Sequence, residues 1–207
     1  MILLNILSSD FFLNSGIYNQ ERKLIKGIDI HYMVNFYMPY KMVDELKNKF
    51  IENKTKIIVT SSISYMFSKI ELNDILAEKC KNKTKLCGKT KRLLTQMVYL
   101  MREENKGLDI VFTHPGVTAS TLFEGLHNNW FWKIAIPIMR HIFMSNDKAS
   151  LPILSGINYN HDNRHWIGPR GLFQVWGYPG IKRVKKNLFD IKEIKLIKEK
   201  VNEIEVN

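Results

Sequence analysis

Short apolar runs rich in β-branched residues alternate with longer segments of helical periodicity, and this alternation constrains the fold most strongly. Three of the runs have strand character: Phe11–Leu13, Lys56–Ser61 and Asp109–Thr113. Strand–helix–strand order predicts a parallel sheet with right-handed crossovers. We therefore expect an α/β sandwich that forms a single domain over residues 1–207.

Helical periodicity marks the segments between and after these strands. Four helices are expected, over Asp29–Lys54, Gly88–Arg102, Asn146–Ile157 and residues 188–205. The last is amphipathic, and Asp190 and Glu193 form a D-x-x-E capping pattern at its start. Before it comes a short region rich in Gly, Pro and Trp, Gly168–Gly180, in which no strand is predicted.

The chain is basic, with 31 Lys and Arg against 20 Asp and Glu and a formal net charge of +11. Such a charge suits nucleic acid, a phosphate-bearing cofactor or an acidic membrane surface, and it could equally reflect a lysine-rich proteome, since the chain is also rich in Ile and Asn. The densest basic stretch, Lys79–Arg92, has no interleaved aromatic residues on which bases would stack. We therefore expect a solvated face there and no nucleic-acid partner.

Cysteine usage and hydropathy bear on the compartment. Cys80 and Cys87 form no C-x-x-C pair and no zinc-type spacing, so reduced thiols in a cytoplasmic protein without a metal are expected. The apolar runs fall far short of the roughly 20 residues that a membrane-spanning helix needs. The apolar start, Met1–Leu4, lacks the basic region of a signal peptide.

Polar and glycine-containing loops follow the carboxyl ends of the predicted strands, where α/β sheets bind ligands. In order along the chain come Asn14-Ser15-Gly16, Asn35 inside a helix, Thr60-Ser61-Ser62, Cys87-Gly88-Lys89-Thr90-Lys91 at a helix start, and Pro115-Gly116-Val117-Thr118. This ordered set resembles the short-chain dehydrogenase/reductase family, over Asp10 to roughly Lys200.

The resemblance implies a Rossmann-like three-layer sandwich that lacks the first strands of the full fold. It also implies hydride transfer between NAD or NADP and a small alcohol or carbonyl. By residue, Ser62 would polarise the substrate oxygen, Lys91 would bind the nicotinamide ribose and lower the pKa of the acid, and Asn35 would hold a water in the proton relay. Two loops would contact the cofactor. The loop after the first strand would lie beside the ribose, with Asn14, Ser15 and Gly16, and the loop after the third strand would lie along the nicotinamide, with Pro115, Gly116, Val117 and Thr118.

Two departures from the family pattern bear on activity. The acid/base tyrosine is replaced by Cys87, whose thiol, with an ordinary pKa near 8.5, Lys91 could shift toward thiolate. The shorter cysteine does not bring a donor within about 2.6–3.2 Å of the substrate oxygen. The glycine-rich pyrophosphate loop is absent before Asp10, so the chain resembles the C-terminal two-thirds of a family member and should bind the cofactor weakly.

Two hypotheses follow for the function. One is an oxidoreductase of this family with impaired turnover, in which water replaces the tyrosine. The other is a non-catalytic remnant, either a gene fragment or a module that binds a partner or ligand. The substrate, the choice between NAD and NADP and the oligomeric state are left open, with a homo-oligomer among the options.

Each candidate residue also has a structural interpretation. Ser62 would cap the following turn, and Asn35 would bond locally or to a neighbouring loop. Lys91 would be one more lysine of a basic surface, and Cys87 a small passive core residue. His114 is expected to pack within its loop.

Residues 123–180 are expected to form a substrate-lid region. Their aromatic cluster reads as a lid or core, or as a peripheral membrane contact aided by Lys133 and Arg140; it comprises Trp130, Phe131, Trp132, Met139 and Phe143. The strand Phe11–Leu13 should present one open backbone edge, partly covered by Met1–Leu7.

Overall fold

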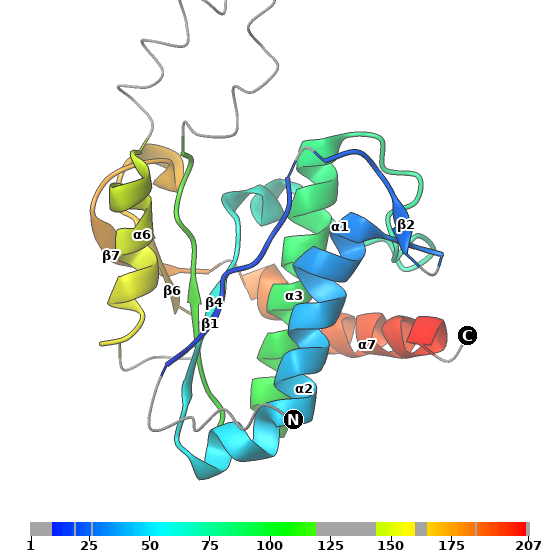
Figure 1. Cartoon of the computed structure of the whole chain (residues 1–207), viewed down its shortest axis with the longest axis horizontal. Coiled ribbons are helices and arrows are strands. Elements are labelled where there is room, and N and C mark those ends of the chain that lie inside the picture. The colour runs from blue at the N-terminus through cyan, green and yellow to red at the C-terminus, as the bar shows by residue number, and fades with distance from the viewer. Residues whose placement is uncertain are drawn as a thin grey trace, which may run out of the picture.

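The computed structural model shows a five-stranded sheet with helices on both faces (Figure 1). It describes residues 10–18, 20–25, 27–118, 144–159, 165–184 and 186–205. The expected α/β sandwich is therefore confirmed. The aromatic cluster expected as a lid, and the N-terminal segment expected to cover the first strand, lie outside the described residues.

The sheet has the strand order β1-β4-β5-β6-β7. Its members are β1 (Phe11–Leu13), β4 (Lys56–Thr60), β5 (Asp109–Thr113), β6 (His165–Pro169) and β7 (Pro179–Arg183). The first four strands run parallel and β7 is antiparallel to β6. The three predicted strands are thus present, and within the described ranges β1 pairs with β4 alone, so it lies at a sheet edge.

The helix expected over Asp29–Lys54 is present in three parts: α1 (Ile30–Tyr32), a π-helical segment (Met33–Tyr37) and α2 (Met38–Glu52). It starts where the Asp29 carboxylate accepts a hydrogen bond from the His31 amide at 2.8 Å. A short antiparallel ribbon, β2 (Leu24–Ile25) and β3 (Ile28–Asp29), leads into it.

The next helix, α3 (Lys83–Glu104), begins five residues before the predicted Gly88. Asn82 caps it by accepting a hydrogen bond from the Lys85 amide at 2.9 Å. This first turn is polar and basic, so it lacks the apolar periodicity from which the start was predicted. It is the capping residue, not the stripe, that marks the beginning of α3.

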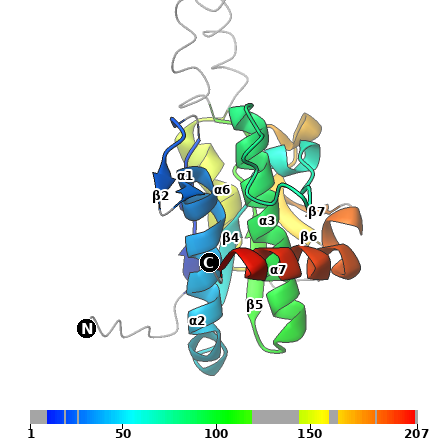
Figure 2. The same ribbon diagram turned by 90° about the vertical axis from the view of Figure 1, so that its right-hand side faces the viewer.

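Helices α2 and α3 cover one face of the sheet and α6 (Asn146–Ser155) covers the other (Figure 1). The terminal helix α7 (Ile191–Glu205) lies across α3 (Figure 2). It begins at Ile191, three residues after the expected start, and the predicted capping residue Asp190 accepts from the Lys192 amide at 2.9 Å. The main core fills the space between the sheet and α2, α3 and α7, with Phe36, Val43, Ile57, Leu94, Met97 and Ile194 all fully or almost fully buried.

The Gly/Pro/Trp-rich region corrects the sequence-based interpretation. Instead of belonging wholly to a lid, its two ends are paired in the β6–β7 hairpin, with Gly168 opposite Gly180 and Pro169 opposite Pro179. Glycine and proline are poor strand formers, and here they lie near the edge of the sheet, where they are tolerated. Over the described part of the chain, no helix combines the length and apolarity needed to cross a membrane.

Candidate functional site

The candidate site lies at the carboxyl edge of the sheet. The parallel strands β1, β4 and β5 end at Leu13, Thr60 and Thr113, so the loops that follow them emerge at the same edge. Helix α3 brings its own residues to this edge from the neighbouring face. All eleven residues predicted for the site lie within the described ranges.

Lys91 connects the loop after β1 to the end of β4. Its Nζ donates to the Ser15 carbonyl oxygen at 2.8 Å and to the Thr60 carbonyl oxygen at 3.1 Å. The side chain is only 6% exposed, so Lys91 is not a lysine of the solvated basic surface. Gly16 lies directly against it, because a Cβ there would be 3.1 Å from both Cε and Nζ of Lys91. The absence of a side chain at Gly16 therefore admits the ammonium.

Burial sets the protonation of this lysine. Desolvation lowers the pKa of Lys91 from 10.5 to about 8, and its interaction with Cys87, one helical turn away, partly opposes the shift. The group is thus a cation near neutral pH, and it loses its proton far more readily than an exposed lysine does.

Asn35 also binds the loop after β1, at Ile17, two residues after the carbonyl group that Lys91 contacts. Its Oδ1 accepts from the Ile17 amide at 2.7 Å, and its Nδ2 donates to the Ile17 carbonyl oxygen at 3.0 Å. Nδ2 also lies 3.2 Å from Oγ1 of Thr90, the residue before Lys91. Asn35 is fully buried in the π-helical segment. It is therefore positioned beside Lys91, and its bonds fit the structural interpretation of a link to a neighbouring loop.

Ser62, Ser64 and Cys87 form a second group. The Ser62 hydroxyl lies 2.8 Å from the Ser64 hydroxyl and caps the short helix Ile63–Phe67 by accepting from the Ser64 amide at 3.3 Å. The Ser64 side chain in turn hydrogen-bonds Cys87. A chain of hydrogen-bonding groups therefore leads from Ser62 through Ser64 to Cys87.

The expected shift of Cys87 toward thiolate is wrong. Burial raises the pKa of the Cys87 thiol and outweighs the opposing effects of Lys91 and Ser64. The thiol is 8% exposed, and a low-dielectric environment disfavours its charged form. Cys87 is therefore a protonated, unreactive thiol near neutral pH.

The loop Pro115–Thr118 is anchored elsewhere. The Val117 amide donates to the Val175 carbonyl oxygen at 3.0 Å, and the Met144 amide donates to the Val117 carbonyl oxygen at 3.2 Å. Thr118 forms an isolated parallel bridge with Met144. The structure thus joins this predicted nicotinamide loop to the segments around Met144 and Val175, while it gathers Lys91, Asn35 and Gly16 at the end of β1. Asn14 is exposed beside that group.

His114 packs within its loop, as expected, and also fixes the loop's path. The Gly116 amide donates to His114 Nδ1 at 3.2 Å, so Nε2 carries the proton and donates to Gln174 Oε1 at 3.0 Å. Gln174 Oε1 also accepts from Trp166 Nε1 at 3.1 Å. Burial lowers the pKa of His114 from 6.5 to about 4, which keeps the ring neutral. Sequence reasoning missed Gln174 because sixty residues separate it from His114.

Gly168 explains why this imidazole fits. A Cβ at Gly168 would collide with Nε2 of His114, which is itself fully buried. A glycine in a strand interior can mark such a close approach. In the described ranges, no group of three or more His, Cys, Asp or Glu side chains could hold a metal ion.

Comparison with known proteins supports the fold. No family model and no curated protein matches the sequence. A crystal structure of an uncharacterized protein from Mycobacterium paratuberculosis is similar, with a TM-score of 0.58 and 14% sequence identity. The match covers 96% of this chain and 69% of that chain. At this identity the likeness shows the fold alone: a Rossmann-like three-layer α/β fold with a mostly parallel sheet.

Proposed function

We propose that this edge of the sheet is the nicotinamide–ribose half of a site of the short-chain dehydrogenase/reductase type, and that it reduces carbonyl substrates slowly. The observation that carries the proposal is the buried Lys91 ammonium, which bridges the loop after β1 and the last residue of β4, while Asn35 holds the same loop at Ile17. A buried cation at the carboxyl edge of an α/β sheet is suited to a polar, phosphate-bearing ligand.

The residues present fit a nicotinamide riboside. Two of the three ammonium protons of Lys91 go to carbonyl oxygens, which leaves one donor for a ribose hydroxyl. Asn14, Ser15 and Gly16 flank that position, and Gly16 contributes no side chain to obstruct it. When bound, NAD or NADP supplies the hydride; the role of the chain is to bind and orient it.

Ser62 is the group that would bind the substrate oxygen. When the Ser64 hydroxyl donates to Ser62 Oγ, the Ser62 hydrogen is free for a carbonyl oxygen of the substrate. A donor placed where negative charge develops stabilises the transition state. The substrate class supported by this arrangement is a small carbonyl or the corresponding alcohol.

Proton transfer is the weak step of this proposal. The Cys87 thiol is buried and its pKa is raised, so it holds its proton at neutral pH. General acid catalysis by a well-placed side chain contributes roughly 10²–10⁴-fold, and a water must substitute for it here. We therefore assign the chain a turnover far below that of an enzyme with a tyrosine at this position.

One observation favours a second candidate, a non-catalytic binding module. Both hydrogen bonds of Lys91 go to main-chain carbonyl groups, which is how a purely structural link between two loops would also be built. In that case the edge binds a ligand or partner and transfers no hydride.

Slow oxidation of NADH or NADPH in the presence of a panel of small aldehydes and ketones tests the first candidate against the second. The first predicts a slow rate that Ser62→Ala abolishes and that Cys87→Ser leaves unchanged, because the thiol does not donate the proton. The control is Lys85→Met, which removes an exposed charge from α3, the helix that carries Cys87, and should leave the rate unchanged. A rate indistinguishable from that of buffer, or one that Ser62→Ala does not alter, would favour the non-catalytic module.

We infer a cytoplasmic location for either candidate. Cys80 and Cys87 are both free thiols in the structure. Reduced cysteines are the rule in the cytoplasm and uncommon in secreted proteins. The inference is checked by fractionating cells that express the tagged chain.

A further inference from the structure

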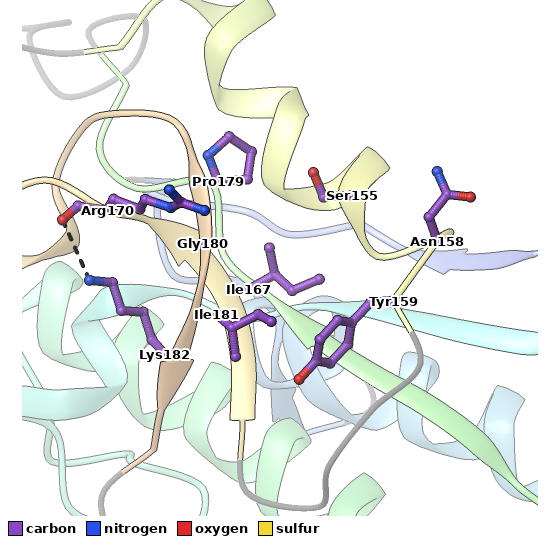
Figure 3. A pocket seen from close by; sticks show the side chains of 9 residues that line it. All are labelled: Ser155, Asn158, Tyr159, Ile167, Arg170, Pro179, Gly180, Ile181 and Lys182. Atoms are coloured by element: carbon purple, nitrogen blue, oxygen red, sulfur yellow. Dashed lines mark hydrogen bonds between the residues drawn. The ribbon is translucent and has the colours of Figure 1, made fainter.

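A cleft separate from the Lys91 edge lies between α6 and the β6–β7 hairpin (Figure 3). Its volume is about 510 Å³, which is within the range of small-molecule sites. Helix α6 covers the opposite face of the sheet from α3, which carries Lys91 (Figure 1). The sequence-based interpretation placed most of these residues in the expected lid region, 123–180, and assigned no individual role to any of them.

The cleft combines an apolar floor with polar walls. Ile167 and Ile181 lie opposite each other in the register of the two strands and supply the apolar contact. Ser155, Asn158 and Tyr159, from the end of α6 and the turn after it, line the other side. Lys56 fixes that turn by donating to the carbonyl oxygens of Ile157 at 2.7 Å and Tyr159 at 3.1 Å. The walls are therefore held in place by the sheet.

Two cations, Lys182 and Arg170, line the cleft, and the one whose charged group has no hydrogen-bond partner among the described residues is Arg170. Its side chain crosses β7 at Gly180, and its guanidinium lies beside Pro179 (Figure 3). Gly180 makes the crossing possible, because a Cβ there would lie 2.5 Å from Cγ and 2.6 Å from Nε of Arg170. Lys182 also lines the cleft, and its Nζ donates to the Arg170 carbonyl oxygen at 3.4 Å, which uses one of its donors and fixes the Arg170 backbone.

The charge of Arg170 is not compensated within the described part of the chain. None of the hydrogen bonds or ion pairs there involves its guanidinium, and no acidic residue lines the cleft. A guanidinium presents a planar fork of donors that matches a carboxylate or phosphate in bidentate fashion. We propose that the cleft binds a small organic anion, with its carboxylate or phosphate on Arg170 and its apolar body on Ile167 and Ile181.

The test uses benzoate and phenyl phosphate as probes and benzamide as the neutral counterpart, followed by methyl NMR shifts of Ile167 and Ile181. We expect both anions to shift these signals in a saturable manner and benzamide to bind about tenfold more weakly or not at all. The tighter of the two anions identifies the carboxylate or the phosphate as the preferred headgroup.

Two variants and one control locate the binding. Arg170→Gln should weaken the better anion about tenfold. Gly180→Ala, which keeps the charge but blocks the crossing, should weaken it by a comparable factor. Arg183→Gln removes one exposed charge from the same strand outside the cleft and should stay within about twofold. Dispersed methyl spectra establish that each variant is folded.

Three results would overturn the proposal. Benzamide binding as tightly as benzoate would show that the cleft does not recognise charge. Equal affinities in Arg170→Gln and Arg183→Gln would show that only the net charge matters. An absence of saturable shifts with either anion would show that the cleft binds neither class.

Discussion

The two cations Lys91, in α3, and Arg170, directly after β6, lie near different parts of the same sheet and have opposite surroundings. Lys91 is 6% exposed, and main-chain carbonyl oxygens accept two of its hydrogen bonds. Arg170 is exposed, and its guanidinium has no acceptor among the described residues. A cation that holds loops together stabilises the fold and keeps few donors for a ligand, whereas an uncompensated one contributes little to the fold and keeps all of them.

The largest difference should be in stability. Lys91→Met leaves the Ser15 and Thr60 carbonyl groups without their donor. The Thr60 bond is buried, and a buried group left unpaired costs about 1–3 kcal/mol, whereas Ser15 is exposed to water, so we expect a loss of about 2 kcal/mol. Arg170→Gln should change the free energy of unfolding by less than about 0.5 kcal/mol. Urea denaturation followed by tryptophan fluorescence measures both. Equal losses in the two variants would erase the distinction between a structural and an available cation.

The next effect is on the pH dependence of stability, through His114. Its pKa is depressed in the folded protein to about 4, from 6.5. Between these values the unfolded chain binds a proton that the folded one does not, so stability falls as the pH drops from about 6.5 toward 4. Each unit of pKa difference corresponds to about 1.4 kcal/mol.

His114→Gln isolates this contribution from that of the carboxylates, which also titrate at these pH values. We expect the variant to have the shallower decline in unfolding free energy over that range, measured by urea denaturation at several pH values. Parallel declines in the two proteins would mean that His114 is protonated in the fold, in conflict with its acceptance of the Gly116 amide.

Two glycines opposite each other in the β6–β7 hairpin should respond unequally to alanine. Gly168→Ala would drive a methyl group into the buried His114 ring and should cost about 2 kcal/mol. Gly180→Ala meets only the flexible side chain of Arg170, which can move aside, and should cost less than about 0.5 kcal/mol. Thermal unfolding of the two variants measures both losses of stability. A smaller loss for Gly168→Ala than for Gly180→Ala would contradict the described packing of His114.

The fold was predictable where local pattern and burial agree. The strands β1, β4 and β5 are apolar runs in a parallel sheet, and the structure confirms all three. The β6–β7 hairpin was missed because its strands contain glycine and proline, which are poor strand formers. The two glycines are needed for contacts that the local sequence does not show, since Gly168 leaves room for His114 and Gly180 leaves room for Arg170.

The candidate site was predictable only as a list of residues. The sequence placed Lys91 in a basic run, and the contacts that bury it come from Ser15 and Thr60, 76 and 31 residues away. The same limit explains the wrong direction for Cys87. Its nearness to Lys91 on one helix face is visible in the sequence, but the burial that outweighs it is a property of the packed fold.

The central claim is that Lys91 holds a nicotinamide riboside, and fluorescence titration with reduced nicotinamide mononucleotide tests it most directly. Because the assigned residues would contact only that half of the cofactor, we predict saturable binding within about threefold of the affinity for NADH. Lys91→Met should weaken it about tenfold, and Lys85→Met should leave it unchanged. No saturable binding, or equal affinities in the two variants, would contradict the account.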